Sequence, residues 1–440
     1  MRNRFFPGFA LISLFLVIAI IIFSISFQED TTAAPKVPIM YLTLAEASTD
    51  DLLSAPKDQT YDLSSLELNA SGTITTYQNL TIKGHGNSTW AEDKKPFQIK
   101  FSTKTSLFGF KKAKKYLLLA NNFDASNLKN AVALELENML NQNFSLSGEY
   151  VDLYINGDYQ GLYFLTEKIE LGKNRIQLSS QSAILVEHEG LHSHLEDYCY
   201  ETTDSACLVV KDINDPALES DAIANFLQKY SELESAAKSS DYAKIQELID
   251  VDSFAKYYLL SDFTLNPDAY MSSYFFYQNG PEDKIHLGPG WDFDLSFSTG
   301  TTQDLNYGID IFSPYSTGAD RAFYSEDVSA TFTTRAGLGE SGESESLIMY
   351  YLIRIPEFKA RVQELYMTYL YGHVNDLLTF INNLIDQIRD SAILNNEKWE
   401  REDFDTAADR LKSWVHNRYD YLESYYANRP AIDSSQILAL

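Results

Sequence analysis

Positive charge is scarce in this 440-residue chain, which has 35 lysines and arginines against 62 aspartates and glutamates and a net charge of −27. The one basic cluster, residues 111–115, is too short to follow a phosphate backbone, which argues against nucleic acid as a partner. An acidic surface suits a basic protein partner. A surface that is acidic only for solubility is the alternative.

Histidine and cysteine, two side chains that often act in catalysis, also give few candidates for a reactive site. No histidine accompanies a nucleophile motif such as G-x-S-x-G, so the sequence gives little support to histidine-based nucleophilic catalysis. The chain has two cysteines, Cys199 and Cys207. In an exported protein their spacing suits a disulfide that closes the tip of a hairpin. The hydrophobic content of 45% is ample for a packed core in one large domain or two ordinary ones.

The amino terminus is the longest uncharged stretch. Residues 5–27 carry no charge and follow Arg2 and Arg4. As a helix this stretch is about 34 Å long, enough to cross a bilayer, and the arginines favour a cytoplasmic amino terminus. We therefore predict a transmembrane anchor over 1–27 and a linker over 28–38, with the rest of the chain outside the cytoplasm. A cleaved signal peptide is the alternative.

Hydrophobic periodicity divides the remaining chain into a mixed front and a helical back. Alternating apolar residues predict strands in the front part, around one helix that Ser126 caps and that continues to about Leu140. Helices dominate the back part. The sequence thus predicts an α+β domain over 39–430, with a strand-rich part over about 39–215 and a helical part over about 216–430.

Two motifs carry candidate chemistry. In GPGWDFD at 288–294, Asp292 and Asp294 lie two residues apart, so in an extended segment both carboxylates point to the same face and are able to share a divalent cation. In GHGNSTW at 84–90, the glycines are followed by small polar residues and leave backbone N–H groups for an anion. The alternatives are a capped acidic turn and a glycosylation sequon at Asn87. Paired carboxylates also serve glycoside hydrolysis, but the GHGNSTW motif argues against it.

These motifs have company elsewhere in the chain: KKPFQIKF at 94–101, YLLLANN at 116–122, VDLYING at 151–157, GLYFLTEKI at 161–169 and NPD at 266–268. In order and spacing they resemble the spore-coat-protein-H (CotH) kinase family, over roughly 39–414. The resemblance implies an atypical, two-lobed protein-kinase-like fold behind the transmembrane helix. It also implies transfer of phosphate from ATP, with Mg²⁺ or Mn²⁺, to Ser or Thr of basic, Ser/Thr-rich secreted or surface proteins. A non-catalytic surface-binding or adhesion protein on the same fold is the alternative.

The resemblance further implies roles for particular residues. Asp268 is the expected catalytic base, and the expected metal ligands are Asp292, Asp294 and Ser273, which stands where a second ligand would be an asparagine. His85 replaces the arginine usual in the glycine motif. The predicted ATP-binding residues are Gly84, Gly86, Asn87 and Ser88 in that motif, Lys95 or Lys100 for the phosphates, Glu135 as a partner of that lysine, Glu167 and His286 along the cleft, and Tyr163 beside the adenine.

Overall fold

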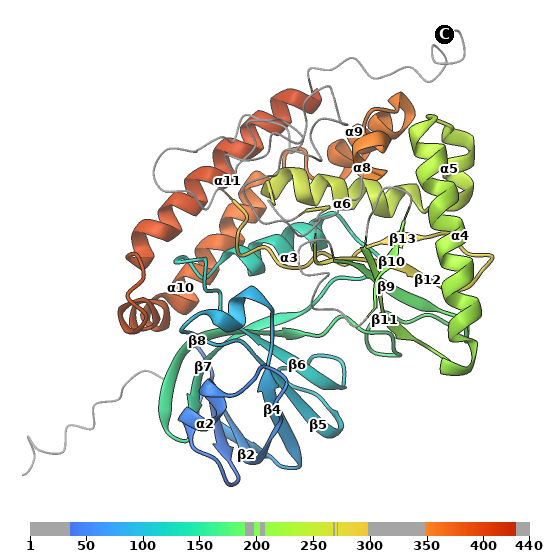
Figure 1. Cartoon of the computed structure of the whole chain (residues 1–440). Helices are drawn as coiled ribbons and strands as arrows, with labels where there is room; N and C mark the ends of the chain where they lie inside the picture. Colours follow the sequence, from blue (N-terminus) through green and yellow to red (C-terminus); the bar gives the residue numbers. More distant parts are fainter. Residues whose placement is uncertain are drawn as a thin grey trace, which may run out of the picture. The chain divides into compact units, whose positions relative to one another are not determined.

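The computed structural model describes residues 36–189, 198–202, 207–266, 269–270, 272–297 and 348–427, and every structural statement concerns these residues. Strands predominate before residue 215 and helices after it (Figure 1). The prediction of an α+β protein with a helical carboxyl-terminal part is therefore right in these respects.

The first sheet closes on itself. Its strand order is β1-β7-β8-β6-β5-β4-β2-β3, and β1 also pairs with β2, so seven strands form a closed sheet and β3 extends it beside β2. Alternate residues such as Ile82, Ile99 and Leu118 fill its interior. Its strands are β1 (Ile39–Leu44), β2 (Tyr61–Ala70), β3 (Thr73–Tyr77), β4 (Leu80–Gly84), β5 (Phe97–Thr105), β6 (Ala113–Leu119), β7 (Gly148–Ile155) and β8 (Asp158–Glu167), with the short helix α2 (Thr49–Ser54) after β1.

This closure corrects the predicted fold. The chain does not have the two-lobed kinase fold, because β1 lies parallel to β7 on one side and antiparallel to β2 on the other, which leaves no open edge between them. The described residues from Val37 onward also belong to one compact unit. The alternation of apolar residues predicts strands but not their partners, and β1 and β7 are more than 100 residues apart in the sequence.

The second sheet combines strands from distant parts of the chain. Its order is β10-β11-β9-β12-β13, and β12 pairs with β9 although the helices within residues 219–264 lie between them in the sequence. A disulfide joins Cys199 and Cys207 at the β10–β11 pair. The strands are β9 (Ile184–His188), β10 (Tyr200–Glu201), β11 (Cys207–Ile213), β12 (Tyr274–Gln278) and β13 (His286–Leu287).

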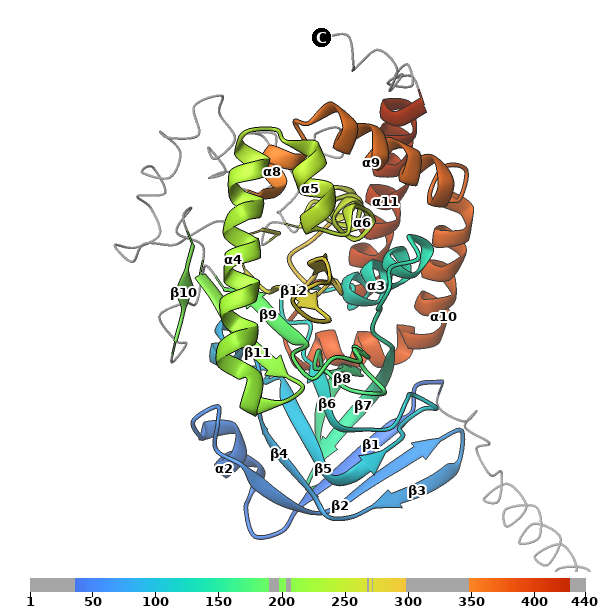
Figure 2. The same ribbon diagram turned by 90° about the vertical axis from the view of Figure 1, so that its right-hand side faces the viewer.

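Helices cover both sheets. Helix α4 packs against β9, and α10 packs against β8 and α3 (Figure 2). Helix α6 is buried at every residue from Ser253 to Thr264, as expected of a helix with neighbours on all sides. The helices are α3 (Lys129–Met139), α4 (Glu219–Lys238), α5 (Tyr242–Leu248), α6 (Val251–Thr264), α8 (Ile348–Leu352), α9 (Pro356–Tyr369), α10 (Val374–Lys398) and α11 (Phe404–Ala427), with short 3-10 turns at Ser88–Ala91 and Pro216–Leu218.

The predicted membrane attachment also needs correction. Within the described ranges, no helix combines the length and the apolar composition that crossing a membrane requires. Residues 1–27, on which the prediction of a membrane-anchored protein was based, lie outside the described residues. The structure therefore gives no support to an anchored localisation, and we do not retain it.

A buried ion pair joins α11 to α6. The Arg418 side chain is fully buried, and its Nη2 lies 3.2 Å from Oδ1 of Asp262. We expect Arg418→Met to lower the free energy of unfolding by about 3–5 kcal/mol, because it leaves the Asp262 carboxylate buried without its cation. Urea denaturation measures the loss. The double variant Arg418→Met, Asp262→Leu is expected to recover most of it, and equal losses in both proteins would contradict the assignment.

Candidate functional site

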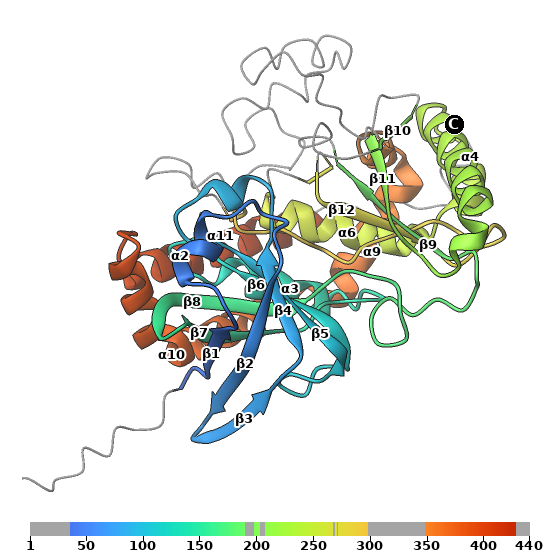
Figure 3. The ribbon, with the colours of Figure 1, turned by 60° about the horizontal axis from the view of Figure 1, so that its bottom comes forward.

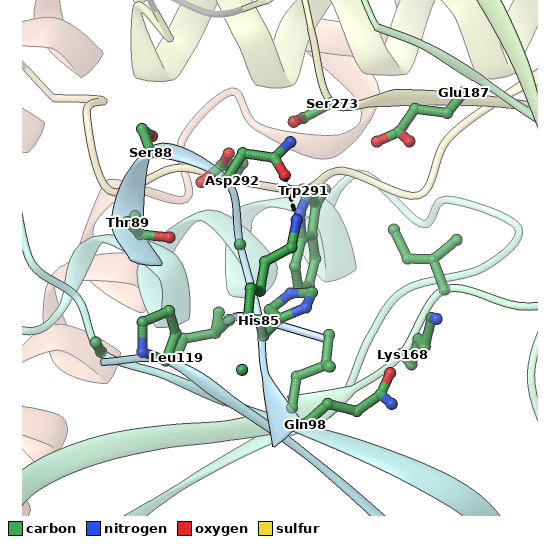
Figure 4. Close-up of a pocket in the computed structure, with 18 of the residues that line it drawn as sticks. His85, Ser88, Thr89, Gln98, Leu119, Lys168, Glu187, Ser273, Trp291 and Asp292 are labelled. Carbon is green, nitrogen blue, oxygen red and sulfur yellow. Dashed lines mark hydrogen bonds between the residues drawn. The ribbon is translucent and has the colours of Figure 1, made fainter. Parts of the chain in front are cut away.

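A cavity of about 480 Å³ lies between the two sheets, within the usual size range of ligand sites. One wall is the outer face of β4, β5 and β6, together with the loop that follows β4. The other wall comes from β9, β11, β12 and residues 291–294 (Figure 4). Segments that are far apart in the sequence thus face one another across a single space.

The cavity brings together two of the predicted motifs. Both motifs line it, the glycine motif from the first sheet and the WDFD segment from the opposite wall, and Ser273 lies beside the second. In Figure 4, Ser88 and Thr89 are on one side of Asp292, and Ser273 and Glu187 are on another. The predicted residues in the lining are Gly84, Gly86, Asn87, Ser88, Ser273, Asp292 and Asp294.

The described lining lacks the predicted nucleotide-binding residues Lys95, Lys100 and Tyr163. Lys95 donates from Nζ to the backbone oxygen of Trp90 at 2.7 Å. Tyr163 is buried inside the closed sheet, where its hydroxyl donates to the backbone oxygen of Lys95 at 2.8 Å. Lys100 is exposed on the outer face of β5, in an adjoining groove.

Three others have local partners instead. Glu135 accepts a hydrogen bond from the side chain of Asn138, one turn along α3. Glu167 forms a 2.5 Å ion pair with Arg175. His286 stacks on Tyr277 with ring centroids 4.9 Å apart. Asp268, the predicted catalytic base, lies outside the described residues.

Glycine is required at two positions of the loop after β4. A Cβ at Gly84 would lie 2.7 Å from the backbone oxygen of Lys57 and 2.8 Å from the Trp90 ring. Gly86 has φ +76°, and a Cβ there would lie 2.1 Å from Oγ1 of Thr89. Gly84 therefore permits the close approach of Lys57 and Trp90 to the end of β4, and Gly86 permits the left-handed turn beside the cavity. The Asn87 side chain is also engaged, since its Oδ1 accepts from Nζ of Lys57 at 2.8 Å.

Helix α3 holds the WDFD segment in place through three hydrogen bonds. The Gly290 N–H donates to Oε1 of Glu137 at 2.6 Å, and the Phe293 N–H donates to Oδ1 of Asn130 at 3.0 Å. Nζ of Lys129 donates to the backbone oxygen of Asp294 at 3.1 Å. The backbone that carries Asp292 and Asp294 is thus attached to a helix whose apolar side is part of the core.

Two residues of the site have an uncommon backbone conformation. Asp292 has φ +65° and Ser273 has φ +57°, in the left-handed region that non-glycine residues seldom occupy. Asn266 steadies the first of them, since its Nδ2 donates to the backbone oxygen of Asp292 at 3.3 Å. Such conformations persist where surrounding contacts fix them, and they occur preferentially at functional sites.

Several residues of the site were missed by sequence reasoning. One signal in the sequence could have identified Glu137 and Asn130. Both are polar residues on a helix that was expected to pack in the core, where polar side chains need partners. Lys83, Lys115 and Lys168 line the cavity as well. Their lining position follows from strand pairing, which the sequence does not display.

The sheet wall of the cavity is rich in positive charge. Burial and, to a smaller extent, the charges of Lys168, Lys57 and Lys83 together lower the pKa of His85 to about 3, so the imidazole is neutral at physiological pH. The rings of His85 and Trp291 come from opposite walls, and their centroids are 6.3 Å apart. Burial and then the charge of Lys115 also lower the pKa of Lys168. An anion in the cavity would relieve this repulsion between like charges.

The opposite wall supplies oxygen atoms suited to a hard cation. Asp292, Asp294 and Ser273 offer carboxylate and hydroxyl groups, which are the donors that Mg²⁺ and Mn²⁺ prefer. Across the described residues, no group of three or more His, Cys, Asp or Glu side chains is placed to hold a metal ion. The donor set therefore fits a cation held by one or two carboxylates together with phosphate oxygens of a substrate.

Comparison with known proteins identifies the family. The chain matches the CotH kinase protein family over residues 82–422. This range is most of the chain and includes both motifs that line the cavity. The chain belongs to the CotH kinase family. The resemblance inferred from the motifs is thereby confirmed, and membership of the family indicates a kinase-like protein. No curated protein matches the chain.

The carboxyl group of Glu137 makes a testable contribution to stability. Burial raises its pKa from 4.5 to about 8, so the folded protein holds a proton that the unfolded chain releases above pH 4.5. This contribution is fully present below pH 4.5 and is lost as the pH rises through about 8, by up to about 1.4 kcal/mol per pH unit. We expect Glu137→Gln, which still accepts from Gly290, to flatten the fall in unfolding free energy between pH 5 and pH 8.

The matched control is Glu135→Gln, which changes a partly exposed carboxyl on the same helix. It is expected to reproduce the pH profile of the parent in urea denaturation at pH 5, 6.5 and 8. A Glu137→Gln profile with the slope of the parent would show that Glu137 does not hold an extra proton in the folded state.

Proposed function

We propose that this protein is a kinase that transfers the γ-phosphate of ATP to Ser or Thr of a protein substrate. The observation that carries the proposal is the cavity whose lining combines the glycine motif, Lys83, Lys115 and Lys168 with Asp292 and Asp294. Phosphoryl transfer needs such a combination, because catalysis depends on positioning the phosphates and on neutralising their charge.

The sheet wall is suited to the phosphates. Lys83, Lys115 and Lys168 bring positive charge to the lining, and the backbone N–H groups of the glycine motif add donors. These lysines replace Lys95 and Lys100 in our proposal, since neither of those lines the cavity. His85 is neutral, so it supplies no positive charge at the position where the family usually has an arginine. In our proposal these lysines bind the phosphates in its place.

The opposite wall is suited to a divalent cation. Asp292 and Asp294 would hold Mg²⁺ or Mn²⁺, and Ser273 would add a weaker hydroxyl ligand. When bound, the cation neutralises charge on the β- and γ-phosphates. The bonds from α3 to the segment keep the two carboxylates in place before the substrate arrives, which lowers the cost of assembling the site.

The acceptor hydroxyl needs a base. We propose Asp268 for this role from its position in the NPD motif, two residues after Asn266. Asn266 contacts Asp292 through its side chain. In the reaction the Ser or Thr oxygen bonds to the γ-phosphorus, its proton passes to the Asp268 carboxylate, and the bond from the γ-phosphorus to the bridging oxygen of ADP breaks.

Replacing the metal ligand and replacing the base are expected to have different effects. Asp292→Asn should abolish phosphate transfer and the metal-dependent part of ATP binding. Asp268→Ala should reduce transfer by a factor of about 100 or more while Mg-ATP binds as tightly as in the parent, because the phosphates and cation keep their ligands. Transfer of labelled phosphate and calorimetric titration with Mg-ATP measure the two effects.

Glu135→Gln is the control for these variants, since Glu135 lies outside the described lining, and it should behave as the parent. Equal loss of Mg-ATP affinity in both aspartate variants would remove Asp268 from the role of base. A parent that binds Mg-ATP but transfers no phosphate to Ser or Thr would favour the alternative, a non-catalytic binding protein. The departures from the family pattern at His85 and Ser273 support that alternative.

The lysine assignment is tested by exchanging one charge at a time. We expect Lys168→Met to raise the KM for ATP about tenfold or more, because it removes a partly buried cation from the phosphate side of the cavity. Lys95→Met also removes a lysine but leaves the lining intact, so its KM should stay within about twofold of the parent. The opposite pattern would return the phosphate contact to Lys95.

A further inference from the structure

An open groove of about 980 Å³ continues from the cavity along the outer face of the closed sheet. Lys83, Gln98, Lys115 and Lys168 line both spaces, so the two are contiguous. Strands β4, β5 and β6 lie side by side in the closed sheet (Figure 3), and residues of all three line the groove. Their outward residues, among them Lys100 on β5, form its floor.

The sign of the charge in this groove is opposite to that of the chain. Its lining has four lysines and only two carboxylates, those of Asp58 and Asp62, in a chain whose net charge is −27. Asp58 is already paired with Lys83, at 2.6 Å. A local excess of positive charge of this kind attracts an anionic partner even when the whole protein is acidic.

The register of the strands adds a second observation. Lys100 on β5 lies directly opposite Lys115 on β6. Like charges at directly opposite positions of an antiparallel pair destabilise the sheet. Lys115 has a carboxylate partner in Glu170, at 3.0 Å. Within the described residues, neither Lys100 nor Lys168 forms an ion pair, although the charge of Glu170 acts on Lys168 from a greater distance.

We propose that this groove docks an acidic segment of the protein substrate. The identity of the occupant as a substrate rests on the proposed kinase function, whereas the docking itself does not. The lysines of the groove lie on neighbouring strands, Lys83 on β4, Lys100 on β5 and Lys115 on β6, with Lys168 just after β8. The segment that fits carries several Asp or Glu side chains within reach of these cations.

This proposal differs from the basic partner that the net charge predicts. Net charge acts on encounter from a distance and is screened beyond about 8 Å at physiological ionic strength, whereas a docked segment interacts with the charges that it touches. A basic segment would place its cations beside Lys100 and Lys168. The groove therefore favours the acidic segment.

The test measures peptide binding without nucleotide. Fluorescence anisotropy is recorded for a labelled peptide with several Glu residues around one Ser, and for a matched peptide with Lys in their place. The variant is Lys100→Glu. Its control is Lys104→Glu, which reverses an exposed lysine on the same strand that lines neither space.

We expect the parent to bind the acidic peptide more tightly than the basic one. Lys100→Glu should weaken binding of the acidic peptide about tenfold, and Lys104→Glu less than about twofold. Equal losses in the two variants, no loss in either, or tighter binding of the basic peptide by the parent would overturn the proposal. So would binding of anionic lipid vesicles, but not of the peptide, through Lys100.

A kinase assay separates this proposal from the proposed function. If both hold, Lys100→Glu should raise the KM for the acidic peptide and leave kcat unchanged, because Lys100 lies outside the cavity. If the parent binds the peptide through Lys100 but transfers no phosphate, the docking groove stands and the kinase function fails. If the parent phosphorylates protein without any dependence on Lys100, the groove fails and the kinase function stands.

Discussion

The hydrogen bonds from α3 to the WDFD segment are the constraint on which the candidate site depends. Glu137, Asn130 and Lys129 together fix the backbone of residues 290–294. The apolar side of α3 is buried in the largest core cluster, so the segment shares the rigidity of that core. This attachment explains how Asp292 remains at φ +65°, a conformation that an unsupported aspartate would leave. Helix α3 therefore determines the geometry of the wall that carries Asp292 and Asp294, although only part of this helix lines the cavity.

The sequence predicts those parts of the site whose requirements are local. The turn at Gly86 involves only neighbouring residues such as Thr89, and the spacing of Asp292 and Asp294 is a property of one short segment. Gly84 is different, because it makes room for the backbone of Lys57, which is distant in the sequence. On β5, alternation places Phe97, Ile99 and Phe101 inside the closed sheet and leaves Gln98 and Lys100 pointing outward. What the sequence did not reveal is the position of the cavity along that face. Gln98 lines the cavity, and Lys100, two residues further on, lines the groove.

The fold shows the same limit. Apolar alternation predicted the strands of the front part, but the closed sheet depends on the parallel pairing of β1 with β7 and on the return of β2 to β1. Neither pairing has a local signature, because each is decided by the packing of the whole interior. Helix α3 illustrates a smaller case. The helix begins at Lys129, whose N–H donates to Oδ2 of Asp124 at 2.9 Å, so an aspartate further upstream takes the capping role expected of Ser126.

The charge of the protein has the same limit as a predictor. The net charge and the local arrangement of the charges favour different partners. The net charge of −27 favours a basic partner, whereas strand pairing gathers Lys83, Lys100 and Lys115 on one face of the sheet. From its length alone, the basic cluster at residues 111–115 was expected to contribute little to the binding of a nucleic acid. Folding nevertheless places Lys115 opposite Lys100 and beside the cavity, where each cation reinforces the other's attraction for an anion. Because exposed charges act mainly within a Debye length, it is this arrangement that decides which segment of a partner the groove binds.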